Sequence, residues 1–287
     1  MIKNLIRPLL PKREKSANKG NFGTLTVVGG SEKYRGAPIL SCEAALRSGV
    51  GICRLCSTEK VISAAAAYRP EIIFQPIEES GAGAIYPESF ISKMKHIMKS
   101  NAILVGNGMT DCYDTEAVVT ALINNYENTL IIDADGLNSI KTCPEKLASA
   151  RKTPIITPHV GEMSRLTKKS ISEIKESREK TAIEFSKEYN CVTVLKDSVT
   201  VIASPEGKCM TVDRENSALS KGGSGDVLAG IIASLSAQGL APYEAALCGV
   251  VIHSEAGLAA SSVMAEDSVL PSDVTACLSK VFKELRS

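Results

Sequence analysis

The stretch Lys221-Gly-Gly-Ser-Gly-Asp226 leads directly into Val227-Leu-Ala-Gly-Ile-Ile-Ala-Ser-Leu235, whose apolar residues recur at helical spacing. Glycines before a buried helix let backbone N–H groups converge on an anion, because no side chain stands in the way. The unpaired N–H groups at the helix start add roughly half a positive charge. The stretch matches neither the Walker A motif nor the G-x-G-x-x-G dinucleotide motif. It predicts either a phosphate cradle or a plain glycine-rich turn with an Asp at a helix N-terminus.

Asp226 favours a chemical role for this stretch, because a carboxylate repels the anion that the glycines attract. Its presence indicates proton transfer. A carboxylate beside a cradle can accept the proton of a substrate hydroxyl while that oxygen attacks phosphorus, a contribution of about 10²- to 10⁴-fold.

Upstream of the cradle, short β-branched runs alternate with amphipathic segments, which predicts a parallel sheet covered by helices on both faces. Most of these runs are continuously apolar, as expected of strands buried on both sides. The expected strands are 24–28, 52–56, 71–74, 102–105, 130–133, 154–157 and 192–196. Segments 199–203 and 209–212 flank the turn signal Ser204-Pro-Glu-Gly207 and predict an antiparallel hairpin at one edge of the sheet.

Helical spacing predicts two surface helices and three core helices. The surface helices are 37–48, which stops before Gly49 and Gly51, and 172–189, which is charged on one face. The core helices, rich in Ala and Leu, are 226–237, 243–260 and 271–285. A length of 287 residues with 44% hydrophobic content suits one core, so residues 1–287 are expected to form one domain.

Composition favours a small-molecule partner. Lys and Arg total 33 against 32 Asp and Glu, which provides no footprint for nucleic acid or an anionic membrane. Arg7, Pro8 and Pro11 interrupt the first apolar residues before a signal peptide can form. Nine scattered cysteines favour a reducing cytoplasm over a disulfide framework. The CxxC pair Cys53 and Cys56 lies in an expected strand, so core packing is the favoured interpretation and redox chemistry the alternative.

A glycine-rich GxGD segment that opens a late core helix after a parallel sheet resembles the anion hole and base of ribokinase-like enzymes. Further segments narrow the resemblance to the ADP- or ATP-dependent NAD(P)H-hydrate dehydratases. These segments are Lys19-Gly-Asn-Phe-Gly23, Thr26-Val-Val-Gly-Gly-Ser31, Tyr34-Arg-Gly-Ala37 with Ala44-Ala-Leu-Arg47, Asp133-Ala-Asp-Gly-Leu-Asn138 and Thr157-Pro-His-Val-Gly-Glu-Met-Ser-Arg-Leu166. The resemblance extends from about residue 20 to residue 257. It implies a three-layer α/β/α sandwich with a mostly parallel sheet and an antiparallel edge hairpin.

The resemblance also implies a reaction. Hydration of NADH or NADPH leaves a hydroxyl on the nicotinamide ring, giving NADHX or NADPHX. Phosphorylation of that hydroxyl in the S epimer creates a good leaving group, which the ring nitrogen's lone pair expels. The family is thus a carbon–oxygen lyase of metabolite repair that uses ADP or ATP with Mg²⁺. Its members are expected to be cytoplasmic homotetramers that depend on an NAD(P)H-hydrate epimerase for the other epimer.

By resemblance, Asp226 is the base, and the N–H groups of Gly223, Ser224 and Gly225 stabilise the transferring phosphoryl group. The expected substrate-binding residues are Ala37, Gly106, Gly108, His159 and Asp226. The expected nucleotide-binding residues are Lys196, Asp197, Ser198, Val199, Thr200 and Gly225.

Several of these assignments have alternatives in the sequence. Ala37, Gly106 and Gly108 also suit ordinary loop and helix-start packing, and Lys196 also suits a solvated charge at a strand end. His159 is preferred over the other histidines because it lies at a strand end, where α/β folds bind ligands. His253, among apolar residues, predicts a core position, and His96, on a polar helix, predicts a solvated one.

Asp133 and Asp135 lie at the end of an expected strand, where Mg²⁺ could be held through water, but Asp133 also suits a helix cap and Asp135-Gly136 a turn. Glu162 is another possible acidic contact, for which helix capping is the alternative explanation. No metal ligand is assigned.

The sequence departs from the family pattern at a few positions. Asn107 stands where Pro is usual, and Thr110 where Gly is usual, so the substrate loop is expected to differ in shape. Asp197 replaces a usual Gly and is expected to add negative charge near a nucleotide phosphate. Glu215 and Ser217-Ala218 replace a Gly and a Pro-Gly before the cradle.

Two other functions remain open at this point. A small-molecule kinase of the same fold would act on a vitamin precursor or a sugar alcohol, and the GxGD segment alone fits it equally well. A nucleotide-binding regulatory protein would not need Asp226. The choice between ADP and ATP is not predicted.

Overall fold

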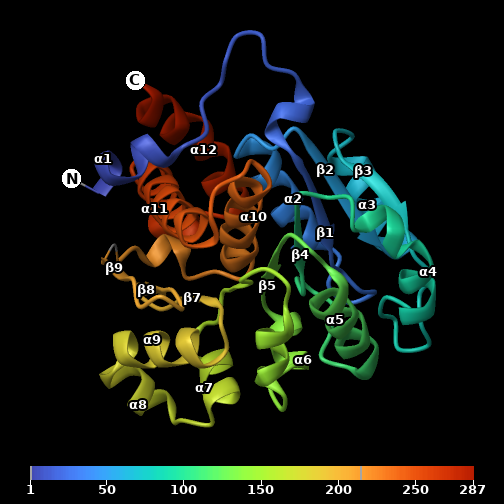
Figure 1. Ribbon diagram of the computed structural model, residues 1–287. Helices are drawn as coiled ribbons and strands as arrows, with labels where there is room; N and C mark the ends of the chain where they lie inside the picture. Colours follow the sequence, from blue (N-terminus) through green and yellow to red (C-terminus); the bar gives the residue numbers. More distant parts are fainter. Residues whose placement is uncertain (1, 214) are drawn as a thin grey trace.

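One sheet with strand order β3-β2-β1-β4-β5-β6-β7-β8-β9 runs through the computed structural model, which describes residues 2–213 and 215–287 (Figure 1). The strands β1 to β7 are mutually parallel, whereas β8 pairs antiparallel with both β7 and β9. Their bounds are β1 Thr24–Val28, β2 Ile52–Ser57, β3 Ile73–Pro76, β4 Ala102–Val105, β5 Thr129–Ile132, β6 Ile155–Ile156, β7 Val192–Leu195, β8 Val199–Ala203 and β9 Cys209–Asp213. The predicted parallel sheet with an antiparallel edge hairpin is confirmed.

Helices cover both faces of this sheet, which produces the three predicted layers (Figure 1). One face carries α2 Gly36–Arg47, α3 Glu59–Tyr68, α10 Ser224–Ala237, α11 Pro242–Ser261 and α12 Pro271–Arg286, with the short α1 Ile2–Ile6 beside them. The other face carries α4 Pro87–Ile97, α5 Tyr113–Asn125, α6 Asp135–Ser139, α7 Val160–Thr167, α8 Ile171–Glu176 and α9 Arg178–Glu188. Short 3₁₀ turns lie at η1 Arg7–Leu9, η2 Lys19–Phe22, η3 Pro144–Ser149, η4 Ser217–Leu219 and η5 Glu266–Ser268.

Each face of the sheet has its own apolar core. Along β4, Leu104 packs into the core that contains α10, while Ile103 and Val105 pack into the core that contains α5. This alternation follows from the two-residue repeat of a strand. Since both faces are buried, the strand reads as a continuous apolar run in the sequence.

The prediction that the helix 37–48 lies on the surface is wrong. In α2, Cys42, Ala44 and Ala45 are fully buried, and the helix packs closely against α10. A Cβ atom on Gly230 of α10 would lie only 2.3 Å from the Ser41 carbonyl oxygen, so glycine is required for this approach. The small residues that hide this helix's amphipathicity are those that bring it close to α10.

The predicted helix 172–189 is instead two helices, α8 and α9, separated at Ser177. Ser177 adopts a non-helical backbone conformation (φ −136°, ψ 44°), and its N–H donates to the Glu173 and Ile174 carbonyls, which ends α8. A serine competes well for such local bonds.

The pair Cys53 and Cys56 lies in β2 and is buried, as predicted. Burial raises the pKa of the Cys56 thiol to about 12. Such a thiol is unreactive at neutral pH, so core packing accounts for the CxxC spacing. Within residues 2–213 and 215–287, no helix is both long and apolar enough to cross a bilayer.

Candidate active site at the carboxyl ends of the strands

The predicted phosphate cradle forms the start of α10. Gly223 has a left-handed backbone (φ +99°), and a Cβ atom there would lie 2.7 Å from Leu40 Cδ1. The N–H of Ser224 donates to the Lys221 carbonyl, and that of Val227 donates to the Gly223 carbonyl. The N–H groups of Gly225 and Asp226 are in the first turn, where a helix offers them no partner. They are therefore available to an anion.

The space in front of the cradle is open except for one ammonium group. A Cβ atom on Gly222 would meet nothing within 4 Å, and one on Gly225 would meet Lys196 Nζ at 3.3 Å. The cradle therefore combines free N–H groups with a nearby cation, an arrangement suited to a phosphate.

Lys196 and Asp133 form a buried ion pair between the ends of β7 and β5, across the end of β6. Lys196 follows β7 and Asp133 follows β5, and Lys196 Nζ lies 2.9 Å from Asp133 Oδ1. Thr157, which follows the intervening β6, donates its hydroxyl to the same Asp133 oxygen at 2.6 Å. Only 2% of the Asp133 side chain and 18% of the Lys196 side chain are exposed. Lys196 is therefore not the solvated strand-end charge that was the alternative interpretation.

The charge of Lys196 is maintained by its neighbours. Burial acts to lower the pKa of the ammonium, but the carboxylates of Asp133 and Glu162 outweigh it and raise that pKa above its ordinary value. Lys196 is thus a stable cation next to the cradle.

Asn107 connects this ion pair to the predicted base. Its Nδ2 donates to Asp226 Oδ1 at 2.6 Å and to Asp133 Oδ2 at 3.0 Å. Asn107 reaches both carboxylates because Gly106 precedes it at φ +119°, where a Cβ atom would lie 2.0 Å from the Asp133 carbonyl oxygen. The contact between these two loops therefore requires glycine at position 106.

The surroundings of Asp226 bring the pKa of its carboxyl closer to neutral pH. Burial is the largest cause that raises its pKa to about 6, and the nearby Asp133 carboxylate adds to that effect. The Asn107 hydrogen bond and the Lys196 charge act in the opposite direction. A carboxylate with this pKa is largely ionised at neutral pH and is still a useful proton acceptor, which suits a general base.

His159 caps α7 and lies beside Lys196. Its Nδ1 accepts hydrogen bonds from the N–H groups of Gly161 at 2.9 Å and Glu162 at 3.3 Å, while Glu162 Oε2 accepts from the His159 N–H at 2.8 Å. About half of the His159 side chain remains exposed. Burial also raises the pKa of Glu162 to about 7.

A cavity of about 380 Å³ opens beside this cluster. Its lining includes the predicted site residues His159, Lys196, Asp197, Ser198 and Thr200. Val199 instead lines a separate cavity beside the start of α9, because side chains along β8 alternate between the two faces of the sheet. The predicted nucleotide segment therefore borders a cavity of suitable size for part of a nucleotide.

Asp197 does not bring the unopposed negative charge expected from the sequence. Its Oδ2 lies 2.7 Å from Arg178 Nη2, at the start of α9. The salt bridge balances the carboxylate locally. This partner was not predicted, because it lies 19 residues away on another element.

His253 is buried, as predicted, but it is not only a core residue. Its Nε2 lies 3.3 Å from the hydroxyl oxygen of Ser224, in the cradle, and its side chain borders the cavity described above. Burial lowers the pKa of His253 to about 4, so the ring is neutral at pH 7. His96 is exposed on α4, as predicted.

The predicted substrate residues Ala37 and Gly108 lie together, next to Asn107. A Cβ atom on Gly108 would meet the Tyr34 carbonyl oxygen at 2.7 Å and Ala37 Cβ at 3.1 Å. Thr110, two residues on, has a positive φ of 75° and is fixed by its N–H bond to Asp135 Oδ2. The departure from glycine at position 110 is thus accommodated by added hydrogen bonds.

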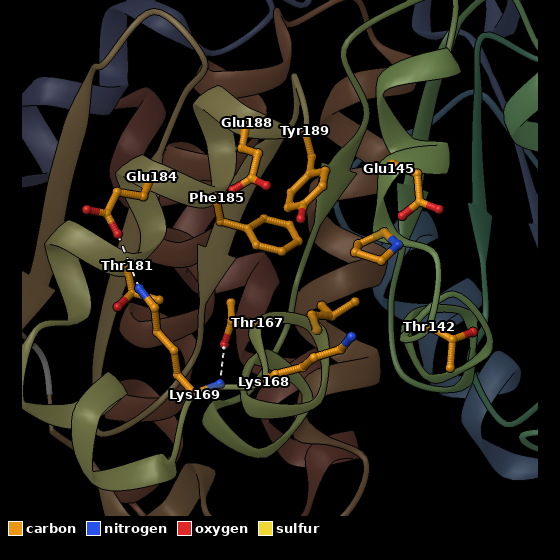
Figure 2. Close-up of a pocket in the computed structure, with 12 residues that line it drawn as sticks. Thr142, Glu145, Thr167, Lys168, Lys169, Thr181, Glu184, Phe185, Glu188 and Tyr189 are labelled. Atoms are coloured by element: carbon orange, nitrogen blue, oxygen red, sulfur yellow. Dashed lines mark hydrogen bonds and ion pairs between the residues drawn. The ribbon is translucent and has the colours of Figure 1, made fainter.

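A second cavity, of about 310 Å³, lies between α7, α9 and η3 (Figure 2). The rings of Phe185 and Tyr189 line it, and Lys169 pairs with Glu184 at 3.2 Å at its side. None of the predicted site residues borders this cavity. This cavity therefore contributes no residue to the candidate active site.

Comparison with known proteins places this chain in a family. The model of the NAD(P)H-hydrate dehydratase family matches residues 25–280. A bifunctional NAD(P)H-hydrate repair enzyme of Thermofilum pendens is 34% identical over 96% of the chain and 53% of that enzyme. The chain thus spans about half the length of the bifunctional relatives it matches. The ADP-dependent (S)-NAD(P)H-hydrate dehydratase of Neisseria meningitidis is 32% identical over 85% of the chain and 79% of that enzyme.

Solved structures agree with this placement. The ADP/ATP-dependent NAD(P)H-hydrate dehydratase of Bacillus subtilis, co-crystallised with ATP and Mg²⁺, superposes with a TM-score of 0.82 at 26% identity, covering 99% of this chain and 97% of that one. A hydroxyethylthiazole kinase of Pyrococcus horikoshii reaches a TM-score of 0.58 at 12% identity, over 99% of this chain and 91% of that one, and so shares the fold alone. The vitamin-kinase alternative therefore has only distant support. With its cradle, its base-like carboxylate and these relatives, the chain belongs to the NAD(P)H-hydrate dehydratase family.

Proposed function

We propose that this protein dehydrates the S epimer of NADHX and NADPHX, with ADP or ATP as the phosphoryl donor, and thereby restores NADH and NADPH. The observation that carries the proposal is the position of Asp226 at the open cradle, hydrogen-bonded to Asn107 and close to the Lys196–Asp133 pair. Membership of the dehydratase family supports the choice of substrate.

In the proposed reaction, Asp226 accepts the proton of the ring hydroxyl as that oxygen bonds to the terminal phosphorus of the nucleotide. The bond between that phosphorus and the nucleotide's bridging oxygen breaks. The N–H groups at the start of α10 stabilise the negative charge on the transferring group. Phosphate then leaves with the carbon–oxygen electron pair, driven by the ring nitrogen's lone pair, and loss of a proton from the adjacent ring carbon restores the double bond.

The nucleotide is proposed to occupy the cavity along Lys196, Ser198 and Thr200, with its terminal phosphate at Gly225. The 3.3 Å approach of Lys196 Nζ to the Gly225 position supports this orientation. An ammonium retains three N–H donors, so Lys196 can bond to a phosphate without releasing Asp133. The hydrated ring is proposed to lie toward Ala37 and Gly108, with His159 at the boundary between the two ligands.

Mg²⁺ is a proposed cofactor, and the residues around the cradle fit it. The carboxylates of Asp133, Glu162 and Asp226 surround the single ammonium of Lys196, which leaves excess negative charge for a cation to offset. Within the described residues, no group of three or more His, Cys, Asp or Glu side chains is arranged to hold a metal ion, so the protein alone would supply at most two such ligands. Mg²⁺ is commonly held by substrate phosphates, waters and one or two carboxylates. Glu162 is the residue proposed to hold it, and the ion would neutralise charge on the phosphates.

The bifunctional relatives suggest the wider setting of this activity. We expect the protein to work alongside an NAD(P)H-hydrate epimerase, because a dehydratase specific for one epimer leaves the other untouched. A cytoplasmic homotetramer is the corresponding proposal for location and assembly.

The test is to mix the purified protein with hydrated NADH, Mg²⁺ and either ADP or ATP, and to follow the return of reduced-nicotinamide absorbance. Absorbance should recover only with nucleotide present, up to the fraction of S epimer, and Asp226→Asn should abolish most of the recovery. No recovery with either nucleotide, together with phosphorylation of a vitamin precursor, would show a small-molecule kinase instead.

A further inference from the structure

The amide of Asn107 is placed between two carboxylates that come from distant parts of the chain. Its Nδ2 carries two N–H bonds, and both are used, one on Asp226 and one on Asp133. The side chain is fully buried, and among the described residues its Oδ1 has no hydrogen-bond partner. A buried amide whose oxygen lacks a hydrogen-bond partner lowers the stability of the folded protein. We therefore look for the role of Asn107 in its two donated hydrogen bonds.

We propose that Asn107 is a positioning residue for the reaction: it fixes the orientation of Asp226 and favours the ionised form that accepts the substrate proton. The inference rests on the proposed function, since it gives a role to the base of that reaction. It concerns a position at which this chain departs from the residue usual in the family.

The geometry explains how one amide can both orient Asp226 and favour its ionised form. A hydrogen bond to Asp226 Oδ1 holds one carboxylate oxygen and leaves Oδ2 to receive the proton. The second hydrogen bond ties the amide to Asp133, which is itself fixed by Lys196 at 2.9 Å and Thr157 at 2.6 Å. Asp226 is thereby linked to the ends of β4, β5, β6 and β7, instead of depending on a free side chain at the start of a helix.

The charged surroundings of Asp226 make this donor important. Burial is the largest cause that raises the pKa of Asp226, and Asp133 and Asp135, at the end of β5 and the start of α6, raise it further. The Asn107 hydrogen bond and the charge of Lys196 at the end of β7 oppose these effects. Since hydrogen bonds to a charged group are stronger than neutral ones, removal of the amide should favour protonated Asp226.

Two variants test the proposal. Asn107→Leu keeps a similar side-chain volume without donors, and Asn107→Ser keeps polarity but is too short to reach both carboxylates. Asn128→Ala is the matched control, because the Asn128 amide bonds to the Ser100 carbonyl at 3.3 Å near the opposite, amino ends of β4 and β5. Thermal unfolding shows which variants fold. If Asn107→Leu does not fold, Asn107→Ser tests the positioning role.

Two readouts should agree. The acid limb of the kcat/KM profile, expected near pH 6 in the wild type, should move up by about one unit in the Asn107 variants. This lowers kcat/KM about fivefold at pH 6 and leaves it less affected at pH 8.5. The titration of the Asp226 carboxyl, followed by ¹³C NMR and assigned from its loss in Asp226→Asn, should show the same shift. Asn128→Ala should show neither.

The outcomes separate the two proposals. An inactive wild type overturns the proposed function, and the NMR titration then still tests the link between Asn107 and Asp226. An active wild type with the same acid limb and the same Asp226 titration in a folded Asn107 variant overturns the positioning role. Equal shifts in Asn128→Ala would also overturn it, because they would reflect general destabilisation.

Discussion

Replacing Lys196 by Met tests the charge arrangement beneath the cradle. Met retains most of the stem but removes the ammonium that bonds to the buried Asp133 carboxylate. Removing one partner of a buried pair costs about 3–5 kcal/mol, because the other charge stays buried. For a chain of 287 residues, this corresponds to a fall in Tm of about 5–8 °C, using the usual unfolding entropy per residue.

The assay is thermal unfolding at neutral pH with and without ADP, and Lys169→Met is the matched control. Lys169 pairs with Glu184 at 3.2 Å, but 41% and 48% of these side chains are exposed. Its loss should cost at most about 1 kcal/mol. ADP should stabilise the wild type and Lys169→Met by the same amount, which is set by the ratio of the ADP concentration to Kd, and should stabilise Lys196→Met less.

The difference between Lys196→Met and the wild type should also depend on pH. Since the pKa of Lys196 is raised above its ordinary 10.5 in the folded protein, the pair's contribution is complete below that value. It is lost as the pH rises through the higher folded-state pKa. In an Asp133→Asn background, Lys196→Met should cost less, because no buried carboxylate remains. If Lys196→Met unfolds like Lys169→Met and keeps the full ADP effect, the reasoning is refuted.

Three further substitutions test the site. Asp226→Asn should keep ADP binding and lose at least about 10²-fold in turnover, and near-normal rates would exclude Asp226 as base. The pKa of Asp226 rises from 3.8 to about 6 on folding, so ionisation of this carboxyl destabilises the folded protein as the pH rises through that window. Asp226→Asn should therefore have a higher Tm than the wild type at pH 8 but not at pH 4. Equal Tm values at pH 8 would contradict the raised pKa. Gly225→Val should crowd Lys196 Nζ and abolish the ADP-induced melting shift, and an unchanged shift would argue against the cradle. Gly106→Ala should destabilise the protein by at least about 3 kcal/mol, because φ is +119° and the new Cβ atom would lie 2.0 Å from the Asp133 carbonyl oxygen. In the control Gly222→Ala, the new Cβ atom would meet no atom within 4 Å. Equal stability of the two variants would refute this estimate.

The sheet was predictable because its strands are buried on both faces. The bounds expected for β1, β4 and β8 match the structure, since each is a continuous β-branched or aliphatic run. β6 is shorter than expected, at Ile155–Ile156, with Pro154 before it and Thr157-Pro158 after it. Proline has no N–H to give to a ladder, so it restricts regular pairing there.

Helix environment was harder to predict than helix position. The expected and observed starts of α2 differ by one residue, yet its burial was missed, because Ala, Ser and Cys give a weak amphipathic signal. Those small side chains allow α10 to approach, and the partner helix lies far along the sequence. Similarly, the break at Ser177 depends on a single backbone conformation within a charged stretch that otherwise favours one helix.

At the site, local backbone demands were visible in the sequence and side-chain partnerships were not. The glycines of the cradle were identified because few residues can replace glycine there. Asp226 was identified because a carboxylate is unexpected beside an anion site. Asn107 was seen only as a change in loop shape, because its partners lie 26 and 119 residues away. Thr157 was named only as part of a family-like segment, and His253 only for its apolar neighbours. Their contacts with Asp133 and Ser224 depend on which strand ends and helices lie side by side.

The structure also answers why a carboxylate can stand at a phosphate cradle. Lys196 lies beside both the Gly225 position and Asp133, so the same cation that lowers the pKa of Asp226 is placed to bind the phosphate of the proposed nucleotide. An anion bound at the cradle draws on the same ammonium and adds negative charge near Asp226, which makes that carboxylate a stronger proton acceptor. In the proposed reaction, phosphate binding and activation of the base would therefore be electrostatically coupled through Lys196. It follows that loss of Lys196 should weaken ADP binding and raise the pKa of Asp226 together, whereas a residue that only supports the fold would change neither selectively.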